Sequence, residues 1–227
     1  MRVGVPRCLS FYYLFSFYRT FLSELGIDFV ETQYSATRDL DNLHLCPTDE
    51  PCVSVKTAFS HVSRLLEQGV DALFVPTVIS LEEDSYCCPK MMGLPYMLRA
   101  AFNLSDSQMI SPVIDFKDNY RDWQKTWFEA GRQMGVNDKR KLRNALFRAI
   151  KAWRSTDAIM HECHLPASSF LDSPKKGLVI DLTKKQTSQS TNAPVTALMG
   201  HSYILNDIFG KTIVKYASSE GPVILPE

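Results

Sequence analysis

The strongest constraint on the fold is the alternation of short apolar runs with longer segments of helical periodicity in the first half of the chain. The expected strands are residues 2–6, 27–30, 72–76 and 109–114. The expected helices between them are residues 11–25, 53–68 and 94–102. Strands that alternate with helices across short links indicate a parallel sheet covered by helices on both faces. The sequence therefore predicts an α/β protein with a Rossmann-like parallel sheet and flanking helices.

After Asp115 this pattern changes, because residues 120–134 and 138–163 read as helices with no clear strand between them. A stretch rich in Ser, Thr, Gln and Lys follows at residues 184–192 and is typical of a linker. One further strand–helix–strand unit closes the chain, and a single unit of this kind cannot form a covered sheet. We expect three parts, namely residues 1–117, a helical segment at 118–183, and the beginning of a second, incomplete Rossmann-like domain at 184–227.

The overall charge gives no reason to expect nucleic acid or an acidic membrane as a partner, because 25 basic and 25 acidic residues balance. The sequence contains no run of about 18 apolar residues and no signal-peptide pattern at its start. A cytoplasmic location is therefore expected. In such a reducing compartment the six cysteines are expected to be free thiols or metal ligands more often than disulfides.

Two cysteine segments are the main candidates for chemistry: residues 49–52 (DEPC) and residues 87–90 (CCPK). Cys52 precedes an expected helix, whose N–H groups and dipole favour a thiolate. Cys87 and Cys88 follow an expected strand, and all three cysteines should reach the carboxyl edge of the sheet, where sites form in open α/β folds. An iron–sulfur cluster is compatible with this arrangement but commonly uses four cysteines. Buried cysteines that act as small apolar side chains are the alternative.

Other patterns are weaker. Cys8 follows the first strand at the same edge and is the best spare ligand, whereas Cys163 could bind zinc with His161 and His164. Acidic residues next to the two cysteine segments are more often exposed loop carboxylates than acids, bases or ligands. The sequence has neither a GxGxxG dinucleotide motif nor a P-loop.

Three segments go beyond spacing and resemble a known family. They are residues 3–7 (VGVPR) with 17–26 (FYRTFLSELG), residues 49–56 (DEPCVSVK) with 59–62 (FSHV), and residues 88–95 (CPKMMGLP). Together they resemble the 2-hydroxyacyl-CoA dehydratase-related proteins. More narrowly, they resemble the uncharacterised domain DUF2229, which occurs alone or fused to the ATP-dependent activators of those dehydratases. Residues 200–203 (GHSY) look like the opening of the family's second Rossmann-like domain.

The resemblance implies oxygen-sensitive one-electron chemistry. Dehydratases of this kind bind a [4Fe-4S] cluster, receive an electron from an ATP-hydrolysing activase, and eliminate water from a 2-hydroxyacyl-CoA. Cys52 and Cys88 match the motif cysteines of the family, and Cys87 is a neighbour that could substitute. The remaining ligands come from later in related chains, so the resemblance implies a truncated or shortened member.

Two functions follow as alternatives. The chain is expected to be a cluster-binding component, and if it is an enzyme, a dehydratase-like lyase or its electron-transfer part, with acyl-CoA as a possible ligand. Alternatively, it is a non-catalytic scaffold that docks on an activase or on a dehydratase subunit.

Overall fold

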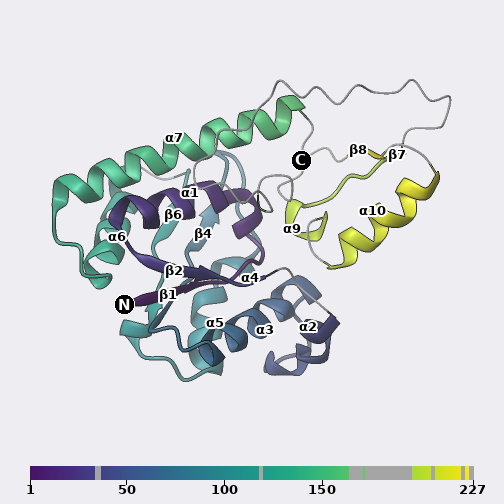
Figure 1. Cartoon of the computed structure of the whole chain (residues 1–227), viewed down its shortest axis with the longest axis horizontal. Coiled ribbons are helices and arrows are strands. Elements are labelled where there is room, and N and C mark those ends of the chain that lie inside the picture. Colours follow the sequence, from purple (N-terminus) through teal and green to yellow (C-terminus); the bar gives the residue numbers. More distant parts are fainter. Residues whose placement is uncertain are drawn as a thin grey trace.

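A computed structural model of the chain describes residues 1–33, 37–117, 120–163, 171, 196–205, 208–220 and 223–224. Its centre is a parallel sheet with the strand order β2-β1-β3-β5 (Figure 1). The predicted α/β class with a Rossmann-like parallel sheet is confirmed. The strands of this sheet are β1 (Arg2–Val5), β2 (Asp28–Glu31), β3 (Ala72–Phe74) and β5 (Met109–Ile110).

Two predicted strands differ in extent from the structure: the strand expected at 72–76 ends at Phe74, and the strand expected at 109–114 is divided at Pro112. Beyond β3 and β5 the chain continues into β4 (Thr77–Ser80) and β6 (Val113–Asp115), which pair as a second parallel sheet. Phe74 pairs with Ile110 and Thr77 with Val113, so the register is unchanged and Pro76 lies opposite Pro112. Since proline has no backbone N–H, Pro112 cannot donate across the ladder, although Val75 and Thr77 still donate to the carbonyls of Ile110 and Pro112 at 3.0 and 2.9 Å.

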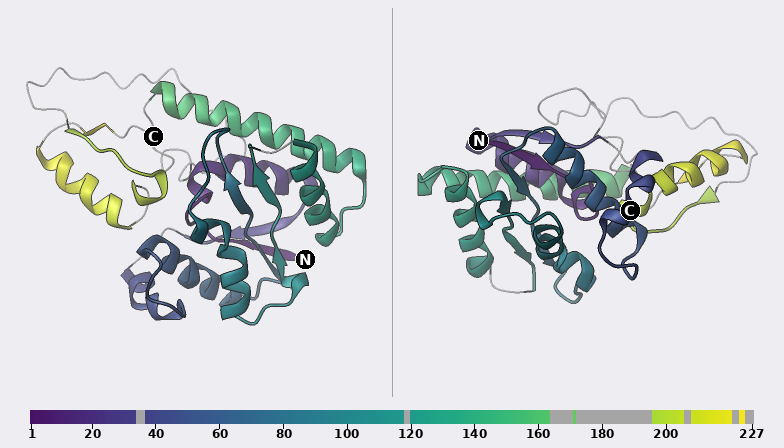
Figure 2. Two further views of the ribbon diagram at one scale, coloured as in Figure 1. Left: turned by 180° about the vertical axis from the view of Figure 1, so that it is seen from behind. Right: turned by 90° about the horizontal axis from the view of Figure 1, so that it is seen from below.

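Helices cover both faces of the main sheet (Figures 1 and 2). One face carries α1, α6 and α7, and the other carries α3 and α5. Gly26 ends α1 in the left-handed conformation (φ 71°) that glycine adopts without strain, directly after the last residue of the predicted helix 11–25. These helices are α1 (Phe11–Leu25), α3 (Val53–Glu67), α5 (Leu94–Ala101), α6 (Tyr120–Gln133) and α7 (Lys139–Cys163).

Short elements connect this framework. Asp138 precedes α7, and its Oδ1 accepts hydrogen bonds from the N–H groups of Arg140 at 2.8 Å and of Lys141 at 3.2 Å. The side chain that caps the beginning of α7 is therefore that of Asp138. The remaining short helical elements are α2 (Thr37–Asp41), η1 (Leu43–Leu45), α4 (Pro89–Met92) and η2 (Asp106–Gln108).

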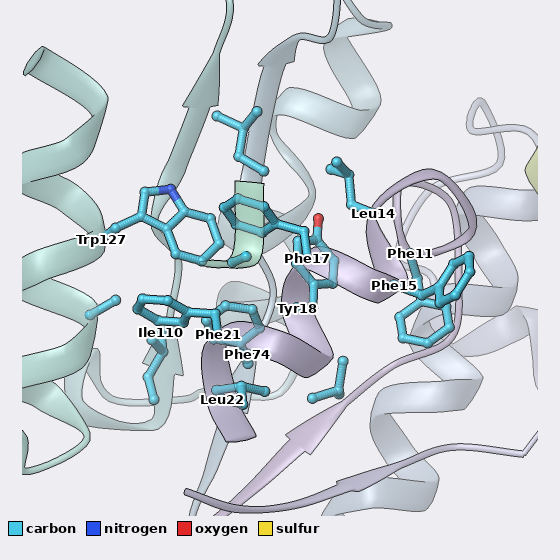
Figure 3. Close-up of a cluster of buried hydrophobic side chains, with 14 of the residues drawn as sticks. Phe11, Leu14, Phe15, Phe17, Tyr18, Phe21, Leu22, Phe74, Ile110 and Trp127 are labelled. Carbon is cyan, nitrogen blue, oxygen red and sulfur yellow. The ribbon is translucent and has the colours of Figure 1, made fainter. Parts of the chain in front are cut away.

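An aromatic cluster forms the core between the sheet and α1, α6 and α7 (Figure 3). The ring of Trp127 lies edge-on to Phe17 at 4.6 Å and to Phe21 at 4.8 Å, measured between ring centroids. Its indole N–H donates a 2.7 Å hydrogen bond to the carbonyl of Val113, so its polar atom is satisfied. This core fixes α6 and α1 against the strands.

The C-terminal unit stands to one side of the main sheet (Figure 2). It consists of β7 (Thr196–Ala197), α9 (Ser202–Leu205), α10 (Ile208–Glu220) and β8 (Val223–Ile224). β7 pairs in parallel with β8, as predicted for a strand–helix–strand unit. The expected linker at 184–192 lies outside the described residues. No helix in the described ranges is both long enough and apolar enough to cross a membrane.

Candidate functional site

Cys52 stands at the beginning of α3 with an exposed thiol. Its backbone is extended (φ −63°, ψ 161°), and its carbonyl accepts hydrogen bonds from the N–H groups of Val55 and Lys56 at 3.0 and 3.1 Å. The thiol makes no capping hydrogen bond. A free sulfur is therefore presented at the end of a helix where backbone N–H groups point outward.

Cys88 occupies the matching position at the beginning of α4, and its thiol is also exposed. Pro89 is the first residue of that helix, where a missing N–H costs no hydrogen bond. The proline also keeps Cys88 extended, because it disfavours helical geometry in the preceding residue. The local sequence thus produces the same arrangement at both sites, in which an extended cysteine directly precedes a helix.

The two cysteine loops meet at the carboxyl edge of the strands. Nζ of Lys90, two residues after Cys88, lies 3.4 Å from Oε2 of Glu50, two residues before Cys52. Both partners of this ion pair are largely exposed, so it marks proximity and adds little stability. The structure therefore brings the two segments together as the sequence predicted.

Cys87 differs from its neighbour, because its side chain is half-buried against the aromatic core. Its N–H donates a 2.8 Å hydrogen bond to the carbonyl of Ile79, which fixes the backbone next to β4. Burial, followed by the nearby Cys88 and Glu82, raises the pKa of the Cys87 thiol. Cys87 is accordingly held towards its protonated form, which disfavours it as a thiolate ligand.

The other described cysteines are buried. Cys8 and Cys46 are 7% and 6% exposed and belong to the hydrophobic cluster under α3 and α5. Cys8 follows β1 at the expected edge, but it is packed and not presented to solvent. Cys46, Cys52, Cys87 and Cys88 are free thiols.

Tyr203 adds a side chain from the far end of the sequence to this edge. It is half-buried and packs against both hydrophobic clusters. Its pKa is raised first by burial and then by the charges of Cys52, Cys88 and Cys87. Sequence reasoning named this residue only within the GHSY segment, because nothing in its local pattern indicates a contact with residues more than 100 positions earlier.

A metal centre needs more ligands than the described side chains bring together at this edge. Within the described ranges, no three His, Cys, Asp or Glu side chains form a group that could hold a metal ion. The exposed thiols of Cys52 and Cys88 thus supply half of a four-thiolate set. Acidic side chains beside them, Asp49 and Glu50, are exposed and pair with lysines, which fits the interpretation as loop carboxylates.

The alternative zinc site at the end of α7 stays a prediction. His161 is exposed and its Nε2 lies 3.7 Å from Oδ1 of Asp157. The side chain of Cys163 and the whole of His164 lie outside the described residues.

A second feature is a cavity of about 270 Å³ at the end of β2. It borders a buried polar network in which Arg64 pairs with Asp39 and Thr32 contacts His61. Arg7 and Arg19 both pair with Glu31. Since these charged groups are engaged with one another, the network reads as structural. The cavity is lined by Val30, Glu31, Thr32, Gln33, Arg64 and Gln68.

Comparison with known proteins identifies a single family. No curated protein and no solved structure matches the chain. The sequence model of a family described as the CoA enzyme activase uncharacterised domain (DUF2229) matches residues 2–227. Since this match extends over nearly the whole sequence, the chain belongs to the DUF2229 family of CoA enzyme activase domains.

Proposed function

We propose that this domain contributes Cys52 and Cys88 as two thiolate ligands of an iron–sulfur cluster, of the [4Fe-4S] type, that a partner subunit completes. The observation that carries the proposal is the pair of free, exposed thiols at two adjacent helix beginnings. The family's link to CoA enzyme activases supports an activase or an acyl-CoA dehydratase subunit as the partner. When bound, such a cluster would supply one-electron transfer.

The residues of this chain would hold and orient the group. Outward-pointing N–H groups at the start of α3 favour negative charge on sulfur and can donate hydrogen bonds to it. Lys56 and Lys90, in the first turn of α3 and on α4, add positive charge near the two thiols. The incomplete donor set in the described residues is the reason to place the remaining ligands on a partner.

The test is anaerobic reconstitution with iron and sulfide, on the chain alone and mixed with a purified activase or dehydratase subunit from the same source. Bound iron, charge-transfer absorbance and the EPR signal are measured for the wild type and for Cys52→Ser, Cys88→Ser and Cys87→Ser. We expect cluster signals in the mixture that Cys52→Ser and Cys88→Ser abolish. The matched Cys87→Ser variant, adjacent in sequence but half-buried, should retain them. Equal iron content in all four proteins contradicts the proposal.

A scaffold function is the second candidate, and exposed apolar side chains on the C-terminal unit favour it. Met199, Ile213 and Tyr216 are 86%, 49% and 72% exposed. Such side chains are suited to contact another protein. Binding to the activase that survives the Cys52→Ser/Cys88→Ser double substitution, together with an absence of cluster signals in the mixture, would favour the scaffold.

A further inference from the structure

The beginning of the C-terminal unit is attached to α1 by aromatic contacts. The ring of Tyr203 stacks on His201, with a centroid separation of 5.1 Å and an interplanar angle of 9°. Tyr13 of α1 meets Tyr203 edge-on at 6.4 Å, and its hydroxyl lies 3.5 Å from Nδ1 of His201. We call these three residues, Tyr13, His201 and Tyr203, the aromatic clamp. It joins segments 188 residues apart, and α9 accordingly lies beside α1 (Figure 1).

The aromatic clamp lies next to the thiol edge. Tyr203 packs against the hydrophobic cluster that contains Val55 and Met91, each three residues after one of the exposed cysteines. It also packs against the aromatic core on the other side of the sheet, together with Cys87. The effect of the Cys52, Cys88 and Cys87 charges on the pKa of Tyr203, secondary to that of burial, agrees with this placement.

We propose that Tyr203 is a positioning residue of the thiol site, whose ring, held by Tyr13 and His201, forms a fixed wall on one side of Cys52 and Cys88. The wall leaves both sulfurs exposed on their outer side, so a partner could still reach them. Its effect is to restrict the direction from which a bulky group approaches. Any effect of this wall on a cluster rests on the proposed function. The wall itself is a feature of the protein without a cluster and does not depend on that function.

The experiment uses cluster-free, full-length protein and compares two alkylating reagents at each cysteine by mass spectrometry. For Cys52 and Cys88, the rate with a bulky maleimide is divided by the rate with iodoacetamide. This ratio reports steric access, because a change in the thiolate fraction affects both rates. In Tyr203→Ala we expect the ratio to rise, because loss of the ring opens a direction of approach that the bulky maleimide could not use. His201→Ala should raise it in the same direction.

Two variants serve as controls. Tyr203→Phe retains the ring and should keep the wild-type ratio, as should Ile204→Ala, which truncates an exposed neighbour that is 39% accessible. Cys46, buried in the cluster under α3, reports unfolding within the same sample. If Cys46 becomes reactive in Tyr203→Ala, that variant is unfolded and the test uses His201→Ala instead, because His201 is exposed.

The proposed wall is wrong if Tyr203→Ala leaves the ratio unchanged while Cys46 stays protected. If Tyr203→Ala unfolds, an unchanged ratio in His201→Ala is the contradicting result. The result is separable from the proposed function. If the maleimide-to-iodoacetamide ratio rises in Tyr203→Ala but no mixture forms a cluster, the wall is supported and the proposed function is wrong. If a cluster forms but the ratio does not change, the proposed function is supported and the wall is wrong.

Discussion

At the residue scale, Asp39 is the clearest case of a charge that depends on its neighbours. Its carboxylate is fully buried, and Oδ1 lies 3.3 Å from Nε of Arg64 and accepts a 2.7 Å hydrogen bond from Ser60. Replacing the arginine by methionine leaves a buried carboxylate without its cation. We expect Arg64→Met to lower the free energy of unfolding by about 3–5 kcal/mol.

A matched arginine is available for that measurement. Arg148 pairs with Glu24 at 3.0 Å, but both side chains are substantially exposed. Arg148→Met should therefore cost less than about 1 kcal/mol in the same urea titration. Similar losses for the two variants would contradict a structural role for the buried pair.

Tyr18 makes the stability of the protein depend on alkaline pH. Burial raises the pKa of this hydroxyl well above the ordinary value of 10.0, although the hydrogen bond with Ser10 acts in the opposite direction. The folded state therefore keeps a proton that the unfolded state loses near pH 10. This group leaves stability unchanged below that pH, and stability falls as pH rises between the unfolded and folded pKa values, with a slope approaching about 1.4 kcal/mol per pH unit.

The measurement is a series of urea titrations from pH 8 to pH 11. Tyr18→Phe should flatten the fall in stability, because it removes one ionisable group from the unfolded chain. Tyr96→Phe, at an exposed position, should keep the wild-type slope. Identical slopes in all three proteins would exclude Tyr18 as a source of the pH dependence.

The candidate site shows which residue positions can be predicted from sequence. The approach of the Cys52 and Cys88 segments was predictable, since they follow β2 and β4, and β4 continues the direction of the parallel strand β3 beyond Pro76. The inward turn of Cys87 was not, because it depends on packing against the core. Tyr203 was not either, since its place depends on the path of the whole chain.

At the element scale, the close approach of α6 to α7 depends on Gly131. A Cβ built on this buried glycine would overlap Cδ2 of Leu142, which is itself fully buried. Alanine gains about 1 kcal/mol of helix propensity over glycine, whereas overpacking typically costs about 1–3 kcal/mol. We expect Gly131→Ala to reduce the free energy of unfolding.

A double-mutant cycle separates this clash from other effects. Leu142→Val alone should destabilise the protein by leaving a small cavity. In the Gly131→Ala background the same change should cost less, because it removes the atom that overlaps. Additive effects in urea unfolding would show that the two side chains do not compete for the same space.

Elements differ in how far the sequence determines them. Residues 11–25 were predicted with both ends, because apolar spacing and Gly26 are local signals. The two strand predictions at 72–76 and 109–114 were wrong in extent, since β3 ends at Phe74 before an unpredicted strand β4, and the second is divided at Pro112. Pro76 and Pro112 were both visible, but their alignment follows from the register between strands, which no local pattern specifies.

At the scale of the whole molecule, the N-terminal part contains nearly all of the described core. Of the buried apolar residues in the described ranges, only Leu171 and Leu205 lie beyond Met160. The sheet, its covering helices and the Trp127 cluster are all formed by residues 1–163. The C-terminal unit meets this body at α9, beside α1.

We therefore expect a protein of residues 1–163 to fold by itself. Its urea unfolding should remain cooperative, and its near-UV circular dichroism should keep the signal of the packed Trp127, because the side chains around that ring are all retained. The same truncation removes His201 and Tyr203, so the maleimide-to-iodoacetamide ratio at Cys52 and Cys88 should rise as in Tyr203→Ala. A broad transition with strong dye binding and no near-UV signal would instead mean that the C-terminal unit is required for the fold.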